Sequence, residues 1–414
     1  MRLTIALLAA LVSAALTPQP ARTQLLFGHL WDGTRLLDDV LVVVEGDRVT
    51  SVSDRQKRIP AGGVDLRRYT ALPGLIDLHT HITYYWDRKP GTTPFNQNVR
   101  PAVTVYLAQE NARRTLDTGV TTSRDLGASA DKDFAMRDLV AMGAMIGPRM
   151  FVSGQGISAG RGGAAPSPAA RATTAQERIK AGADWVKVYG SRGSFDSVDT
   201  TQTITYEEMQ AIVDAAHALG RKVAIHSYGP SGVKDAVRAG ADSVEHGIEL
   251  DDETIAEMVR RGTVWVPTID HNRYYVDARD EYRFTPDKIG PLQDYIAKNL
   301  ESTARAFKAG VRIGMGSDAV YSMFGQNTRE LEWFVKAGMT PAQALATATT
   351  TAADLLGEKD RLGRLAPGFA ADIVAIDGKP LENIKDVITG VRWVMKDGRV
   401  VVDRLGQPRP ANER

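Results

Sequence analysis

The chain of 414 residues contains no cysteine. Neither a disulfide bond nor a cysteine-linked lipid anchor can therefore form, although an oxidising compartment is still compatible with this composition. Charge of one sign is not in excess either, because the formal net charge is +1 and no basic tract or low-complexity block stands out. This balance disfavours nucleic acid and membrane surfaces as partners. We also find no fold-defining repeat of solenoid period.

The start of the chain has the pattern of a secretory signal peptide. Arg2 precedes an apolar run over residues 3–16, and Pro18 and Pro20 follow among small and polar residues. The run is too short to favour a bilayer span, and a buried N-terminal helix is the alternative interpretation. We therefore predict that residues 1–24 are a signal peptide, and that the mature protein is periplasmic or secreted without a stable membrane anchor.

The rest of the chain has the composition of a soluble globular protein, with 43% hydrophobic and 24% charged residues. Residues 25–72 contain short strands and turns, such as a strand over 39–45 that ends at the turn Gly46-Asp47. Residues 365–414 have the same character. Because neither piece is long enough to be stable alone, we predict one small β-sandwich domain formed by both chain ends.

Between these two pieces, residues 73–364 alternate between predicted strands and amphipathic helices, a pattern typical of a parallel sheet. Eight strands are predicted, over residues 75–81, 120–125, 149–154, 185–189, 222–226, 243–246, 263–267 and 311–318. Eight strand–helix units over about 300 residues predict an α/β fold of the (β/α)8 TIM-barrel type.

Potential metal ligands occur at or near the carboxyl ends of these strands, where such barrels hold their active sites. His79 and His81 are two residues apart on the first strand, so their side chains share one face and can converge on one ion. His226 and His246 end the fifth and sixth strands. Four of the seven histidines occupy these positions, which random scatter would rarely produce.

Lys187 and Asp318 complete the candidate set. Alternation along the fourth strand points the Lys187 amine into the barrel, where an unpaired charge is costly. A buried neutral amine can capture carbon dioxide as a carbamate that bridges two metal ions; pairing with a nearby carboxylate is the alternative. Asp318 follows Gly314 and Gly316 on the eighth strand, so it could bind metal and accept a proton from water, or else cap a helix.

Candidate substrate contacts are less sharply defined. His271 follows the seventh strand and either contacts substrate or supports the loop. Arg124, Arg192 and Arg273 could each bind a substrate carboxylate through two hydrogen bonds, and the sequence does not choose among them.

With these residues in place, the chain resembles a binuclear member of the amidohydrolase superfamily, within the imidazolonepropionase-like or Xaa-Pro dipeptidase-like group. That group includes metal-dependent dipeptidases, carboxypeptidase-like enzymes and ochratoxin-hydrolysing amidases. The matching motifs are Pro73-Gly74-Leu75-Ile76-Asp77-Leu78-His79-Thr80-His81, Val186-Lys187-Val188, Ala224-Ile225-His226-Ser227-Tyr228, Val244-Glu245-His246-Gly247, Gly316-Ser317-Asp318 and the segment 365–374.

The resemblance implies a role for each residue. The more buried metal would be held by His79, His81 and Asp318, the more exposed one by His226 and His246, with N6-carboxylated Lys187 between them. Imidazole and carboxylate ligands suit zinc, with manganese, cobalt or iron as alternatives. A metal-bridging hydroxide would attack the scissile carbonyl, and Asp318 would act as general base and then as general acid. Tyr228 matches a position that contacts substrate in this group, although packing at the barrel rim is the alternative.

One departure limits the assignment of substrate. Many relatives have a Gly-Gly-His-Gly segment after the third strand, whereas this chain has residues 157–166 without histidine. We therefore predict an amidase or peptidase acting on C–N bonds of small molecules, namely dipeptides or N-acyl amino acids, and carry over no single activity. A lactonase, cyclic amidase or phosphoesterase on the same metals is the first rival, and a non-catalytic binding protein the second. A homo-oligomer is compatible with the sequence.

Overall fold

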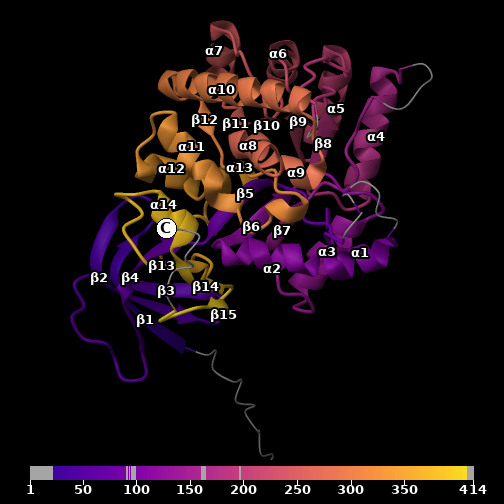
Figure 1. Ribbon diagram of the computed structural model, residues 1–414. Coiled ribbons are helices and arrows are strands. Elements are labelled where there is room, and N and C mark those ends of the chain that lie inside the picture. The colour runs from indigo at the N-terminus through magenta and orange to yellow at the C-terminus, as the bar shows by residue number, and fades with distance from the viewer. Residues whose placement is uncertain are drawn as a thin grey trace, which may run out of the picture.

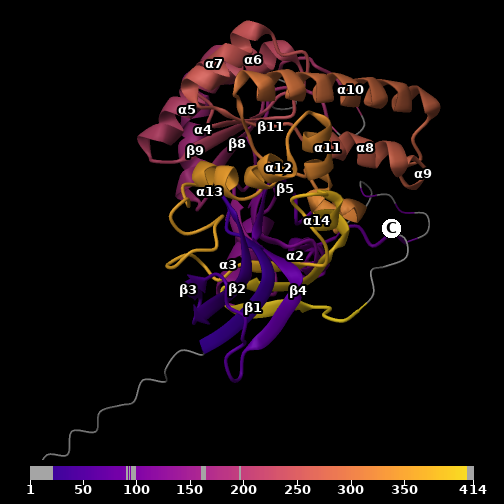
Figure 2. The ribbon, with the colours of Figure 1, turned by 90° about the vertical axis from the view of Figure 1, so that its left-hand side faces the viewer.

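The computed structural model describes residues 22–89, 92, 94, 99–159, 165–194 and 197–407. Strands from the two chain ends lie together at one end of the molecule, and most helices lie at the other (Figure 1). The view turned by 90° shows the same division, with the long helix α10 (Pro286–Ala309) lying across the end remote from the terminal strands (Figure 2). Along the described residues, no helix combines the length and apolar character needed to cross a bilayer.

The strands from the two chain ends come together in one domain, as the sequence predicts, and they form a single seven-stranded sheet. Its order is β15-β14-β13-β4-β1-β2-β3. The bounds are β1 Arg22–Trp31, β2 Leu36–Glu45, β3 Arg48–Ser53, β4 Val64–Pro73, β13 Ile373–Ile376, β14 Val391–Lys396 and β15 Arg399–Asp403. The two ends meet where β13 pairs antiparallel with β4, and buried apolar side chains from both ends form a shared core. Neither end has to be stable alone.

All eight strands predicted for the central region are present, in two parallel sheets. One has the order β5-β6-β7, with β5 Leu75–Thr80, β6 Val120–Asp125 and β7 Arg149–Val152. The other has the order β12-β11-β10-β9-β8, with β8 Trp185–Tyr189, β9 Lys222–His226, β10 Ser243–Glu245, β11 Val264–Val266 and β12 Arg312–Ile313. Parallel order brings all their carboxyl ends to the same side.

Helices follow most of these strands. Their bounds are α1 Pro101–Leu107, α2 Gln109–Asp117, α3 Lys132–Ala141, α4 Pro168–Lys180, α5 Tyr206–Ala218, α6 Pro230–Ala239, α7 Asp252–Arg261, α8 Ile269–Asp277, α9 Arg279–Tyr282, α11 Glu330–Lys336, α12 Pro341–Thr347, α13 Thr350–Leu356 and α14 Lys385–Thr389, with 3-10 turns at Tyr321–Met323 and Asn327–Arg329. Helix α5 ends shortly before Gly220, whose φ of 67° is a conformation that favours glycine.

The eighth strand is shorter than predicted. The sequence favours a strand over residues 311–318, but regular pairing covers only Arg312–Ile313. Beyond it, the backbone at Gly316 packs so closely against neighbouring strands that a side chain would not fit. A Cβ on Gly316 would lie 2.4 Å from Val266 Cγ1 and 2.8 Å from His79 Cβ. Asp318 then takes a φ of 50°, which ends the extended backbone. The segment is therefore an irregular loop packed against β5, with Asp318 at its end.

This close packing gives a first testable expectation. Gly316→Ala should lower the free energy of unfolding by about 1–3 kcal/mol, because the added methyl group must displace β5 or β11. Urea denaturation of both proteins measures the difference. Unchanged stability would mean that the strands separate easily at this point.

Candidate metal centre

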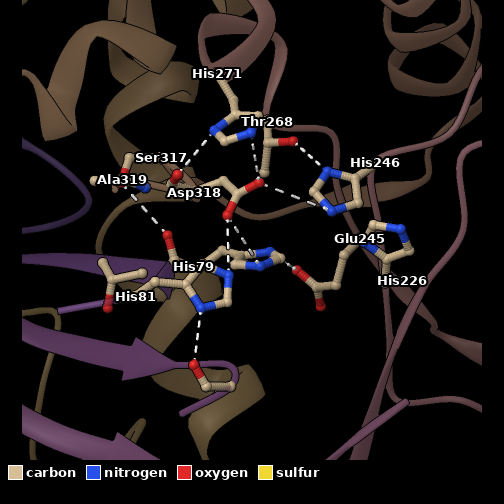
Figure 3. A network of polar contacts seen from close by, with 12 residues as sticks. His79, His81, His226, Glu245, His246, Thr268, His271, Ser317, Asp318 and Ala319 are labelled. Carbon is tan, nitrogen blue, oxygen red and sulfur yellow. Dashed lines mark hydrogen bonds and ion pairs between the residues drawn. The ribbon is translucent and has the colours of Figure 1, made fainter. Parts of the chain in front are cut away.

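The carboxyl ends of the parallel strands surround a cavity of about 240 Å³. The described residues that line it are His79, His81, Tyr84, Lys187, Tyr189, Ser194, His226, Tyr228, His246, His271, Tyr275, Asp318, Val320 and Tyr321. All six residues predicted as metal ligands are in this set, and all six are buried. They come from β5, β8 and β9 and from the segments that follow β5, β10 and β12. Figure 3 shows the four histidines and Asp318.

Three of the six are especially close together. His79, His246 and Asp318 each offer one ligand atom, and these atoms lie within 4.8 Å of one another. Buried imidazole and carboxylate groups at this spacing fit a metal ion. The set thus joins residues separated by more than 200 positions in the chain.

His79 is oriented by Glu245, which forms a buried ion pair with Arg124. Its Nδ1 donates to Glu245 Oε2 at 2.9 Å, which turns Nε2 toward Asp318 Oδ1 at 3.5 Å. Arg124 donates to the other Glu245 oxygen at 2.8 Å, and its guanidinium lies 4.4 Å from the centre of the Trp185 ring. Burial raises the pKa of Glu245, but the Arg124 charge and the His79 hydrogen bond outweigh it and bring the pKa to about 2. Glu245 is therefore a charged acceptor that fixes the imidazole tautomer.

The other histidines are oriented in the same manner, each by a hydrogen bond on one ring nitrogen. His81 Nδ1 donates to the Gly127 carbonyl at 3.1 Å, and His226 Nε2 donates to the Gly193 carbonyl at 2.7 Å. His246 Nδ1 lies 2.6 Å from Thr268 Oγ1 (Figure 3). In each ring the remaining nitrogen is left as a possible metal ligand.

Lys187 is a buried residue that lines the cavity. Its Nζ is 3.4 Å from His79 Nε2 and 5.2 Å from the centre of the Tyr189 ring. Burial lowers the pKa of this amine to about 8. A substantial neutral fraction therefore exists near pH 8, as carbamate formation requires.

Asp318 faces several imidazoles. Its Oδ1 lies 3.2 Å from His81 Nε2, and its Oδ2 lies 3.2 Å from His271 Nε2. Burial raises the pKa of Asp318, but the nearby histidines hold it well below its ordinary value. The carboxylate thus points into the cavity, where it can bind a cation or take up a proton.

Of the residues predicted to contact substrate, two line the cavity and the three arginines do not. Tyr228 and His271 line the cavity, and His271 Nδ1 also donates to the Asp318 carbonyl at 2.8 Å. Arg192 is exposed and is not among the lining residues. Arg124 is buried against Glu245, and Arg273 binds Asp270 and Asp277. Of the predicted loop over residues 157–166, positions 160–164 lie outside the described part.

Sequence reasoning missed several residues of the site. Glu245 precedes His246 within a quoted motif, yet nothing in the pattern reveals its contact with His79. Strand alternation puts Tyr189, two residues beyond Lys187, on the same face as the lysine, but no role at the site was predicted for it. Tyr275 lies one helical turn beyond His271, and their rings are 4.8 Å apart. Nothing in the sequence indicates that Thr268 contacts His246.

Four non-glycine residues at the site have a positive φ: His246 (65°), Thr268 (50°), Asp318 (50°) and Tyr321 (47°). Such backbone is costly for most residues, above all for a β-branched one, and tends to occur at functional sites. Buried Glu330 supports the turn at Thr268 by accepting hydrogen bonds from the backbone amides of Ile269 and Asp270. The loops that present the site are therefore held in unusual conformations by the surrounding fold.

Comparison with known proteins agrees with this geometry. The model of the amidohydrolase family matches residues 70–401. The chain belongs to this family. Its members generally use metal ions, and as a member the protein is a hydrolytic enzyme.

Individual relatives point in the same direction. The chain is 28% identical to the ochratoxinase of Aspergillus niger, over 86% of this chain and 80% of the relative. It is 25% identical to the imidazolonepropionase of Streptomyces avermitilis, over 83% and 81% of the two chains. The crystal structure of a Xaa-Pro dipeptidase with methionine bound in its active site superimposes with a TM-score of 0.83 and 30% identity, covering 92% of this chain and 99% of the other. These neighbours indicate a fold of the TIM-barrel type.

Proposed function

We propose that the protein is a binuclear metal-dependent hydrolase that cleaves amide bonds in dipeptides or N-acyl amino acids. The observation that carries the proposal is the convergence of four imidazoles, the Lys187 amine and the Asp318 carboxylate on one cavity. The similarity to an ochratoxinase and to a Xaa-Pro dipeptidase supports an amide substrate.

The residues present fit two divalent ions, with zinc as the expected metal. One ion would be held by His79, His81 and Asp318, the other by His226 and His246, and carboxylated Lys187 would contact both. The fit rests on the hydrogen bonds that fix one nitrogen of each ring and leave the other as a ligand. Nitrogen and oxygen donors without thiolate suit zinc.

The chemistry is then divided between the ions and the protein. When bound, divalent ions lower the pKa of water and polarise a carbonyl group. Asp318 accepts the proton of the attacking water on a carboxylate oxygen and passes it to the leaving nitrogen. His271 Nδ1 donates to the Asp318 carbonyl at 2.8 Å, which fixes the backbone that presents this carboxylate to the cavity. Tyr228, whose ring lies 5.1 Å from His226 and 4.9 Å from His246, contacts the substrate near its reacting carbonyl.

A substrate screen tests the function. Zinc-loaded protein is incubated with a panel of dipeptides and N-acyl amino acids, and in parallel with lactones, cyclic amides and phosphoesters. We expect hydrolysis of amides that is abolished by a chelator and restored by zinc. Turnover of the lactone, cyclic amide or phosphoester panel alone would favour the rival reactions, and inactivity on every panel would contradict the proposal.

The proposal includes a closed (β/α)8 barrel over residues 73–364 and a β-sandwich made from residues 25–72 and 365–414. Two isolated parallel bridges support closure of the barrel: Ile157 with Val188, between β7 and β8, and Thr80 with Ala319, beyond β12. They join the two parallel sheets at both junctions.

Export is also part of the proposal. Residues 1–21 lie outside the described part of the chain, whereas Arg22 begins β1 and pairs with Glu45. Cleavage after residue 24 would remove Arg22, Thr23 and Gln24 from this strand. We therefore revise the predicted leader of residues 1–24 and expect the mature N-terminus at or before Arg22. N-terminal sequencing of the exported protein checks this, and an intact leader in the exported fraction would contradict it.

Lys187 provides a further prediction. A neutral amine reacts with carbon dioxide to give a carbamate and one proton, and the neutral fraction grows as pH rises through about 8. Zinc reconstitution of metal-free protein should therefore yield more activity with bicarbonate than in buffer depleted of carbon dioxide. Half-buried Lys222 serves as the control, because Lys222→Ala should keep this dependence. A wild-type yield independent of bicarbonate would argue against carboxylation.

A further inference from the structure

One wall of the cavity is aromatic and apolar, and it lies beside Asp318. Val320 and Tyr321 follow Asp318 by two and three residues, and Tyr84 follows His81 by three. The Tyr84 ring stacks on the His81 ring with centroids 4.7 Å apart, and it lies 5.7 Å from the Tyr321 ring. We call Tyr84, Val320 and Tyr321 the aromatic wall.

The fold holds this wall in place at a conformational cost. Tyr321 has a φ of 47°, a conformation that side-chain-bearing residues seldom adopt. The Tyr321 amide donates to the Tyr84 carbonyl at 2.9 Å, which ties the loop after β12 to the loop after β5. Tyr84 and Tyr321 are only partly buried and line the cavity, so they can still cover apolar surface of a ligand.

The position of the aromatic wall beside Asp318 indicates which half of a substrate it would contact. Asp318 must reach the leaving nitrogen to protonate it, and Asp318 contacts His81, on which the wall stacks. Under the proposed mechanism, the amine portion of a bound substrate would therefore lie on the Asp318 side of the cavity, which is also the side of the wall. Among the described lining residues, the charged side chains are Lys187 and Asp318, and both belong to the proposed ligand set.

Resting on the proposed function, we propose that the enzyme selects substrates whose amine portion has an aromatic or large apolar side chain. The side chain would pack on Tyr84 and Tyr321, because aromatic pairs add offset or edge contacts to the burial of apolar surface. The aromatic wall would thus determine specificity on the leaving-group side.

Three dipeptides test this inference on the zinc-loaded protein: Ala-Phe, Ala-Ala and Phe-Ala. We expect kcat/KM for Ala-Phe to exceed that for Ala-Ala by at least about 30-fold, and that for Phe-Ala by a similar factor. A ratio of Ala-Phe to Ala-Ala below about threefold, or faster cleavage of Phe-Ala, would overturn the inference.

Two variants connect the selectivity to the wall. Tyr321→Asn removes the ring while asparagine tolerates the positive φ, so the ratio of Ala-Phe to Ala-Ala should fall several-fold toward unity. Tyr106→Asn is the matched control, because Tyr106 is 72% exposed on α1 and should keep the wild-type ratio. An unchanged ratio in Tyr321→Asn would exclude the wall as its cause.

A binding measurement separates failure of this inference from failure of the proposed function. If no peptide or N-acyl amino acid is hydrolysed, the function fails, and calorimetry with free L-phenylalanine and L-alanine then tests the wall. Tighter binding of L-phenylalanine that weakens in Tyr321→Asn supports the inference. Equal binding of the two amino acids overturns it.

Discussion

Asp318→Asn should lower kcat by about a thousandfold, because an amide cannot take a proton from water and return it to a leaving nitrogen. Asparagine is the informative replacement. It has nearly the same shape as aspartate, and it tolerates the φ of 50° at this position. The backbone of the loop should therefore stay in place, so that the loss reports on the chemistry of the side chain.

Steady-state kinetics on the best amide substrate measures this effect, with zinc content determined by elemental analysis and folding by thermal unfolding. Asp252→Asn is a suitable control, because the Asp252 side chain is 95% exposed on α7. Activity above about a tenth of wild type in zinc-loaded Asp318→Asn would exclude the proton-transfer role.

Arg124→Met should lower the free energy of unfolding by about 3–5 kcal/mol, because it leaves Glu245 charged and buried without its guanidinium partner. Methionine approximately fills the space, so the loss reflects charge more than a cavity. Urea denaturation of the metal-free protein measures the change. A loss below about 1 kcal/mol would mean that His79 alone stabilises the Glu245 carboxylate.

The pH dependence provides an internal check. In the wild type, Glu245 has a pKa of about 2, depressed from an ordinary value of 4.5, so its stabilising contribution is present above pH 4.5 and is lost as pH falls toward 2. The difference between wild type and Arg124→Met should therefore shrink over that range. Arg260→Met, which breaks an exposed pair with Glu257, should change stability within experimental error at any of these pH values.

The sequence predicted the strands well where the pattern was simple. Strands β6, β8 and β9 have the predicted bounds. Each is a run of five or six residues with at least two β-branched side chains. The strand before Asp318 was predicted too long. Gly314 and Gly316 are compatible with an extended strand. In the structure, however, glycine is required at both positions because β5 and β11 lie too close for a side chain, and local sequence does not encode that distance.

Ligand candidates could be found because strand ends of a parallel sheet meet on one side. This rule brought His79, Lys187 and His226 to the same cavity without knowledge of any distance. It could not rank the arginines. Arg124 and Arg273 were candidates for binding substrate, yet both are engaged by carboxylates of the protein itself.

The sequence by itself determined which side chains are available at the strand ends, since periodicity and turn residues fix where each strand stops and which face a side chain takes. Only the tertiary structure decided how those side chains are aimed. The Glu245 contact with His79, the Thr268 contact with His246 and the stacking of Tyr84 on His81 each join different segments of the chain. Hydrogen bonds and ring contacts depend on ångström-scale distances between such segments, and these distances exist only once the whole chain has packed.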